Sequence, residues 1–206
     1  EWGRSVARIQ HVAKLEYRDR VIERTGEVLG SFKDNTFKIA PQDLLLKGAG
    51  DRVAGRCYPL ALAMAAALHK SNTAANTLRA RFFLTVINSE DADSKAFVSM
   101  IEELRDAPVN DIGKPLMRSD LAQVVAILEE KTASTTLMLN SDNHSMLVAK
   151  IFEGERSNYL FYDPNLGTYE IGTSLAFRGA LTDFFLRKEM AMHYAAFGDA
   201  QRPTFD

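Results

Sequence analysis

The order of helix-forming and strand-forming segments predicts an α+β fold, in which a helical N-terminal part precedes a small antiparallel sheet and a closing helix. Up to about residue 131, apolar residues recur mostly at helical spacing. Between residues 135 and 171 the chain changes to short β-rich segments bounded by turn residues. A helical pattern returns at residue 174. These three observations define the predicted class.

Length and composition limit the possible functions. The 206 residues fit one structural unit, with a helical extension over 1–50 and a core over 51–206. A chain that is 46% apolar and 25% charged can bury a core without disulfides. The net charge of −2 gives no electrostatic case for nucleic-acid binding, and the apolar runs are too short for a membrane span. Because the chain begins with Glu1 rather than Met, we expect it to be a fragment of a longer protein.

The helical part is assigned segment by segment. Residues 1–30 are predicted to form an amphipathic helix with a basic face, although acidic residues interrupt that face. Glycine, proline and asparagine punctuate 31–56, so we expect a loop with at most one helical turn at 42–47. Helices are predicted over 59–70, 91–106 and 121–131, with a linking loop over 108–115. The apolar segment 76–88 could be a helix or a strand, and we favour the helix.

The second half of the chain is predicted to build the sheet. Strands are expected over 135–139, 145–152, 158–162 and 168–171, with a hairpin turn at Gly154. The closing helix is predicted over 174–188. We expect the tail beyond it, up to Asp206, to be loosely held.

The chain's one cysteine is the candidate nucleophile. Cys57 follows Gly55 and Arg56 and directly precedes the helix-forming run LALAMAAAL. A thiol at a helix N-terminus lies at the positive end of the macrodipole, which favours the thiolate. The alternative is an inert, buried thiol, which is what most free cysteines are.

A nucleophilic cysteine needs a base, and the sequence favours His144 among four histidines. His69 lies on the cysteine's own helix but more than three turns away. His11 and His193 lack nearby turn chemistry. His144 follows a polar loop and begins a strand, where it can face a helix N-terminus packed against the sheet edge. The alternative is a histidine that only closes the loop.

Asp163 is the candidate that orients His144. If residues 153–156 form the hairpin turn, the end of the second strand returns to the level at which the first strand began. Asp163 then lies within reach of the imidazole. The order Cys, His, Asp is the papain-like order. Asp163 also suits a plain β-turn, and the two roles are compatible.

Two motifs carry a family resemblance. The turn DPNLG at 163–167, preceded by Phe161 and Tyr162, resembles the D-P-N-[FL]-G turn of the YopT-type cysteine proteases of bacterial effectors. The tripeptide Arg56-Cys57-Tyr58 resembles the Arg-Cys-Asp/Tyr motif of one branch of that group. That branch comprises the "makes caterpillars floppy"-like (MCF) effector domains of multifunctional-autoprocessing RTX (MARTX) toxins. The resemblance covers about residues 50–190.

The resemblance implies an autoproteolytic cysteine peptidase with a papain-like core. The domain would be secreted within a larger bacterial toxin and would act in the host cytoplasm, at the Golgi or other endomembranes. It would cleave its own chain near the N-terminus after binding a host ADP-ribosylation factor small GTPase. This activity would serve virulence, and the domain's contact with the membrane would be only indirect.

The oxyanion-binding groups are less well defined. The residues just before Cys57 lack the glutamine that papain uses for this purpose. The backbone N–H of Cys57 could serve instead, helped by the side chain of Asn143 or Arg56. Either side chain could also contact the substrate, and Arg56 could equally be a solvated charge or a clamp on an acidic neighbour.

Two other functions fit the same residues. Acyl transfer and deamidation pass through the same thioester, and a module that binds a host GTPase would need no cleavage at all. A metal site is not expected, since CxxC, HxxxH and HExxH are all absent. We expect no cofactor.

Overall fold

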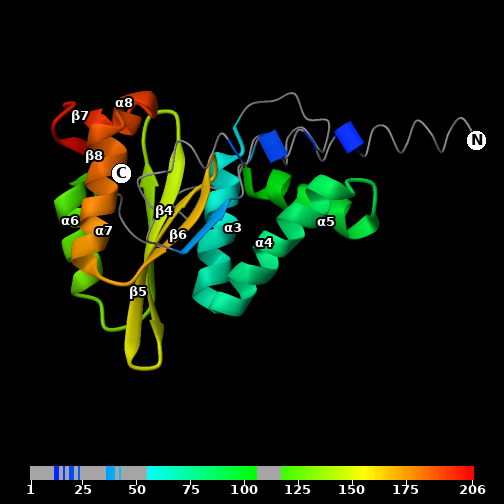
Figure 1. The fold of residues 1–206 in the computed structure, drawn as a ribbon, viewed down its shortest axis with the longest axis horizontal. Coiled ribbons are helices and arrows are strands. Elements are labelled where there is room, and N and C mark those ends of the chain that lie inside the picture. Colours follow the sequence, from blue (N-terminus) through cyan, green and yellow to red (C-terminus); the bar gives the residue numbers. More distant parts are fainter. Residues whose placement is uncertain are drawn as a thin grey trace, which may run out of the picture.

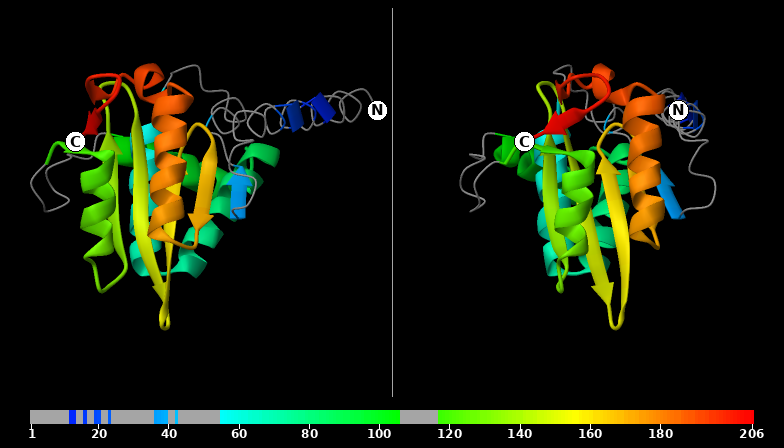
Figure 2. Two further views of the ribbon diagram at one scale, coloured as in Figure 1. Left: turned by 60° about the vertical axis from the view of Figure 1, so that its left-hand side comes forward. Right: turned by 90° about the vertical axis from the view of Figure 1, so that its left-hand side faces the viewer.

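A central five-stranded antiparallel sheet carries helices on both faces (Figure 1). The computed structural model describes residues 12, 13, 16, 19, 20, 23, 36–39, 42, 55–105 and 117–206. Helix α3 (Cys57–Lys70) lies against one face, and α4 (Asn72–Ile87) and α5 (Ala92–Arg105) pack on it. Helices α6 (Leu121–Glu129) and α7 (Ser174–Thr182) cover the other face (Figure 2). The predicted α+β class is confirmed.

The sheet has the strand order β1-β6-β5-β4-β3. Its strands are β1 (Thr36–Ile39), β3 (Thr135–Asn140), β4 (Ser145–Glu153), β5 (Arg156–Asp163) and β6 (Gly167–Ile171). Four of these strands agree with the predicted segments. Each neighbouring pair is antiparallel, so the short connections between β3 and β6 give a meander.

Helices on both faces explain the apolar run that forms β4. Alternate side chains of a strand point to opposite faces. Met146 and Val148 enter the core beneath α6 and α7, whereas Leu147 and Ala149 pack against α3. Because both faces are covered, the strand is a continuous apolar stretch rather than an alternating one.

The hairpin between β4 and β5 sets the level of the strand ends. Glu153 pairs with Arg156 around a turn in which Gly154 has φ 65°, a conformation that favours glycine. Continuing that register pairs Leu147 with Tyr162. Asp163 therefore ends β5 beside the start of β4, as the sequence predicts.

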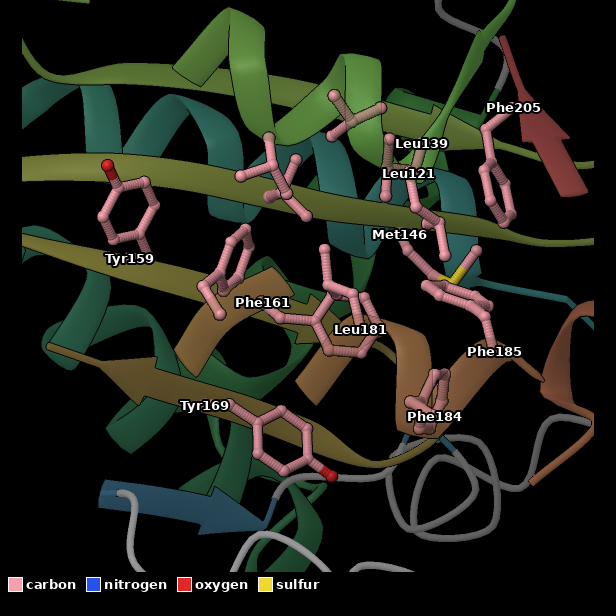
Figure 3. Close-up of a cluster of buried hydrophobic side chains, with 14 of the residues drawn as sticks. Leu121, Leu139, Met146, Tyr159, Phe161, Tyr169, Leu181, Phe184, Phe185 and Phe205 are labelled. Carbon is pink, nitrogen blue, oxygen red and sulfur yellow. The ribbon is translucent and has the colours of Figure 1, made fainter. Parts of the chain in front are cut away.

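The larger core lies between the sheet and α6 and α7, and it is rich in aromatic rings (Figure 3). Phe161 is almost fully buried, with ring centroids 5.2 Å from Phe184 and 5.8 Å from Phe185 and Tyr169. Burial of apolar surface is the dominant favourable contribution to folding, and large aromatic rings bury more of it than other side chains. This core fixes β5, the strand that ends at Asp163.

Helix starts on this face have well-formed caps. Asp120 accepts from the backbone N–H of Gln123, and the Gln123 side chain accepts in return from the N–H of Asp120, so α6 begins with a capping box. The Thr173 hydroxyl caps α7. Helix α7 continues as a π-helical turn, η3 (Asp183–Arg187), which completes the predicted closing helix.

The expectation of a loosely held tail is wrong. After α8 (Met190–His193), the strands β7 (Phe197–Gly198) and β8 (Pro203–Phe205) form a second sheet with β2 (Ser119–Asp120). Phe205 is buried in the main core. Asn140 and Asp206 exchange two backbone hydrogen bonds of 2.8 and 2.9 Å, and Arg118 binds the Asp206 carboxylate. Burial of Phe205 and these pairings hold the tail.

A second correction concerns residues 31–56, which were expected to be loop with one helical turn. Residues 36–39 form the edge strand β1, antiparallel to β6. Four residues are too short a segment for periodicity to identify, and pairing with β6 stabilises the strand. Gln42 is helical, but the rest of the predicted turn at 42–47 lies outside the described residues, as does the loop at 108–115. The described positions between 12 and 23 are helical, whereas the rest of the predicted 1–30 helix and most of the 1–50 extension lie outside them.

In the part of the chain that the structure describes, no helix has the length and apolar character needed to cross a membrane.

Candidate active site

Cys57 is the first residue of α3 and is partly exposed. The chain reaches it through Gly55, whose φ of 91° favours glycine. The helix then begins without a side-chain cap at Arg56, and its first bond runs from the N–H of Leu60 to the carbonyl of Arg56. A hydrogen bond from the backbone of Tyr58 reaches the thiol, as does one from Ser145 at the start of β4. The nucleophile candidate therefore lies at a helix N-terminus that faces the sheet.

His144 immediately precedes β4 and is held there by its own loop. The N–H of Ser141 donates to the carbonyl of His144 over 2.9 Å, and the N–H of His144 donates to the Ser141 hydroxyl over 3.1 Å. The side chain is buried. These contacts fix the backbone from which the imidazole extends.

Asp163 is fully buried at the end of β5, and its carboxylate meets His144. Nε2 of His144 lies 2.8 Å from Oδ1 of Asp163. The same oxygen accepts from the backbone N–H of Asn165 over 2.8 Å, and the carbonyl of Asp163 accepts from Leu166. Asp163 thus forms its turn and binds the histidine at once. Since Nε2 is occupied by Asp163, Nδ1 is the nitrogen left for Cys57.

Cys57 and His144 shift each other's pKa, and Asp163 contributes to the shift of His144. Burial raises the pKa of the Cys57 thiol, but hydrogen bonding to His144, its charge and the backbone bonds outweigh burial, so that the pKa lies below its usual value. Burial lowers the pKa of His144, but hydrogen bonds to Asp163 and Cys57 and their charges raise it to about 9. Opposite shifts in the two groups are those of a thiolate–imidazolium pair.

The other two predicted site residues directly precede Cys57 and His144 in the chain. Arg56 is buried, its guanidinium forms an ion pair with Glu102 of α5, and it also donates to the carbonyl of Gly55. Of the roles predicted for Arg56, the clamp on an acidic neighbour fits these contacts. Asn143 is exposed next to His144 and remains a predicted oxyanion or substrate contact.

Two residues that the sequence did not indicate lie within the site. Tyr194, after α8, donates its hydroxyl to Oδ2 of Asp163 over 2.7 Å and stacks on the His144 ring. Gln42 accepts from the backbone N–H of Arg56 over 2.9 Å and donates to Asn165. No motif marks either residue, so only the folded chain identifies them.

In the described ranges, no group of three or more histidine, cysteine, aspartate or glutamate side chains is placed to hold a metal ion.

A cysteine at a helix N-terminus, facing a histidine–aspartate pair on an antiparallel sheet, is the arrangement expected of a cysteine protease-like domain. The solved structures include a similar one, the cysteine protease-like domain of the Photorhabdus asymbiotica toxin PaTox. The two superpose with a TM-score of 0.68 at 16% sequence identity, over 96% of this chain and 62% of that one. This likeness establishes the fold.

Residues 1–206 match the Mcf1 protease effector domain model, and the chain belongs to that family. It is also similar to the toxin Afp18 of Yersinia ruckeri, with 26% identity over 133 residues. That match covers 63% of this chain but only 6% of the toxin, so the chain spans a small part of its relative's length. The expected family relationship is confirmed, and the chain is an effector domain with a cysteine protease-like fold.

Proposed function

We propose that this domain is a papain-like cysteine protease in which Cys57, His144 and Asp163 act together. The Cys57 thiolate attacks the scissile carbonyl and forms a tetrahedral intermediate. His144 gives its proton to the leaving amine, which leaves a thioester that water then hydrolyses. Asp163 orients the imidazole and stabilises its positive charge. The observation that carries this proposal is the 2.8 Å contact between His144 and the buried Asp163, with the thiol as the imidazole's other partner.

The oxyanion of the intermediate needs hydrogen-bond donors. We assign the backbone N–H of Cys57 at the start of α3 as the first donor. Asn143, exposed beside His144, suits the second role better than Arg56, because Glu102 already engages the Arg56 guanidinium.

The substrate and the trigger are proposed from the family. The peptide cleaved is the chain's own upstream segment, and the trigger is a host small GTPase of the ADP-ribosylation factor family. The domain would then be secreted within a larger toxin, of the MARTX kind or a related one, and would act in the host cytoplasm at the Golgi or other endomembranes. The similarity to a much longer toxin supports delivery within a larger chain.

A cleavage experiment tests the proposal. The domain with its native upstream segment is incubated with host cell extract, and new N-termini are identified by mass spectrometry. We expect a new N-terminus in the wild-type chain and none in the Cys57→Ala variant, because only the thiolate can form the thioester. Equal cleavage by both would contradict the proposal. A shift of about 1 Da on a glutamine, without a new N-terminus, would indicate a deamidase that uses the same thioester.

The pH dependence of cleavage follows from the two pKa shifts. Cys57 must be deprotonated and His144 protonated for the reaction to proceed. The pKa of His144 is raised to about 9, so we expect kcat/KM to fall as the pH passes through about 9. On the acid side, kcat/KM should rise with a midpoint below the usual thiol pKa of about 8.5, because the pKa of Cys57 is lowered. A rate that only rises through pH 8.5 and keeps its value above pH 9 would argue against the ion pair.

A further inference from the structure

The carboxylate of Asp163 is bound on both of its oxygens. Oδ1 accepts from His144 and from the backbone N–H of Asn165, and Oδ2 accepts from the hydroxyl of Tyr194 over 2.7 Å. Three donors on a carboxylate with no exposed surface leave it little freedom to rotate. Two of the three bonds come from the turn and the histidine, and the third comes from the tail.

Tyr194 contacts both members of the pair. Its ring stacks on the imidazole of His144, with centroids 4.0 Å apart and planes inclined by 28°. The side chain is itself buried, at 3% exposure. Burial and the neighbouring charge of Asp163 raise the pKa of Tyr194, so the phenol remains a protonated donor throughout the working pH range. One side chain therefore holds the carboxylate by its hydroxyl and covers the imidazole with its ring.

The contacts continue from Tyr194 back to the nucleophile. The Asn165 side-chain amide donates to the Tyr194 oxygen over 3.4 Å, and the Gln42 amide donates to Asn165. The side-chain oxygen of Gln42 accepts from the backbone N–H of Arg56, next to Cys57. The backbone N–H of Gln42 donates to the carbonyl of Pro164 over 2.6 Å. The hydrogen bonds run from Gln42 through Asn165 and Tyr194 to Asp163, with every donor directed toward the carboxylate.

We propose that Tyr194 is a positioning residue that fixes Asp163 and His144 in the orientation His144 needs to meet Cys57, and that Asn165 and Gln42 support it. This inference rests on the proposed function, in which the histidine–aspartate pair serves the thiol. Without the Tyr194 hydroxyl the carboxylate can turn away from Nε2. Without its ring the imidazole can rotate out of the plane that joins Asp163 to the thiol. Either movement weakens the ion pair that keeps Cys57 deprotonated.

The test measures the thiol itself and needs no substrate. The rate at which iodoacetamide alkylates Cys57 is recorded from pH 5 to pH 10 for the wild-type chain and for Tyr194→Phe. Phenylalanine retains the stacked ring and removes only the hydroxyl. We expect the midpoint of the profile to move to higher pH by about one unit, so that alkylation below the midpoint falls about tenfold. NMR titration of the histidine ring should show the pKa of His144 falling from about 9.

Tyr159→Phe is the matched control. Tyr159 is a buried phenol in the same core, where its ring stacks on Phe177 and its hydroxyl bonds to Ser174 rather than to the site. This variant loses the same atom as Tyr194→Phe, so a general loosening of the core would shift both profiles alike. We expect the profile of the control to match that of the wild-type chain.

Further variants separate positioning from other causes. Asn165→Ala removes the side-chain bond to Tyr194 but keeps the backbone bond to Asp163, and Gln42→Ala removes the bond from Gln42 to Asn165. Both variants should move the midpoint to higher pH, by less than Tyr194→Phe does. In an Asp163→Asn background, Tyr194→Phe should have no further effect, because Tyr194 acts through Asp163. If Tyr194→Phe is poorly folded by circular dichroism, the Asn165→Ala profile decides the inference.

The outcomes are distinct. An unchanged midpoint in Tyr194→Phe, or a His144 pKa that rises, would overturn the positioning role and leave the proposed protease intact. A rise would mean that the hydroxyl only weakens the charge that Asp163 presents to His144. An ordinary thiol profile in the wild-type chain, both alone and with an ADP-ribosylation factor GTPase added, would overturn the proposed function and this inference with it.

Discussion

His144→Ala is expected to abolish activity as completely as removal of the nucleophile. Members of a catalytic triad act as a unit, so losing the base alone costs about 10⁴-fold or more in kcat. His144 supplies the proton to the leaving amine and the positive charge that, with its hydrogen bond, lowers the pKa of Cys57. Without it only burial and the backbone bonds act on the thiol. We therefore expect the thiol pKa to rise and alkylation by iodoacetamide at pH 7 to slow.

A surface histidine provides the control for this variant. His69 lies near the C-terminal end of α3, is exposed, and belongs to the same helix as Cys57. His69→Ala should keep both the cleavage rate and the alkylation rate. Cleavage by His144→Ala within tenfold of the wild-type rate would mean that another group acts as the base. Such a result would remove the main support for the proposed mechanism.

The contact between His144 and Asp163 could be predicted because it depends on local chain geometry. The hairpin turn at residues 153–156 and the alternation of β4 and β5 set which residues meet at the strand ends. That geometry brings Asp163 to His144 without knowledge of the tertiary fold. Cys57 was indicated by a helix start, which is also a local feature. The packing of Cys57 against the sheet is a tertiary contact. It was inferred from the papain-like order of Cys57, His144 and Asp163 along the chain.

Tyr194 and Gln42 could not be predicted for the opposite reason. Tyr194 reaches the site because α8 folds back over the loop before β4, where the carbonyl of Ala195 accepts from the N–H of Asp142. Gln42 lies fifteen residues before Cys57 and is brought back by the turn at Pro164. No periodicity or motif marks either residue. The ordered tail could not be predicted either, because Phe205 is buried by tertiary packing that no local pattern indicates.

Phe161→Ala is expected to lower the free energy of unfolding by about 3–5 kcal/mol, the usual cost of removing a buried phenylalanine ring. The ring is 1% exposed and packs among Tyr169, Phe184 and Phe185, which come from β6 and η3 (Figure 3). Its removal leaves a cavity that rigid aromatic neighbours cannot fill. Urea denaturation followed by circular dichroism measures the change, read from the midpoint at constant slope.

The same substitution separates fold stability from site chemistry. Phe161 lies two residues before Asp163 on the same strand, but its ring faces α7 and η3, whereas its neighbours Leu160 and Tyr162 face α3. In the fraction of molecules that remain folded, the register of β5 with β4 should keep Asp163 at His144. We therefore expect alkylation of Cys57 well below the unfolding midpoint to retain its pH profile.

Leu175→Ala, at an exposed position of α7, should change stability by less than about 0.5 kcal/mol. A loss of less than about 1 kcal/mol for Phe161→Ala would mean that the aromatic core does not hold β5.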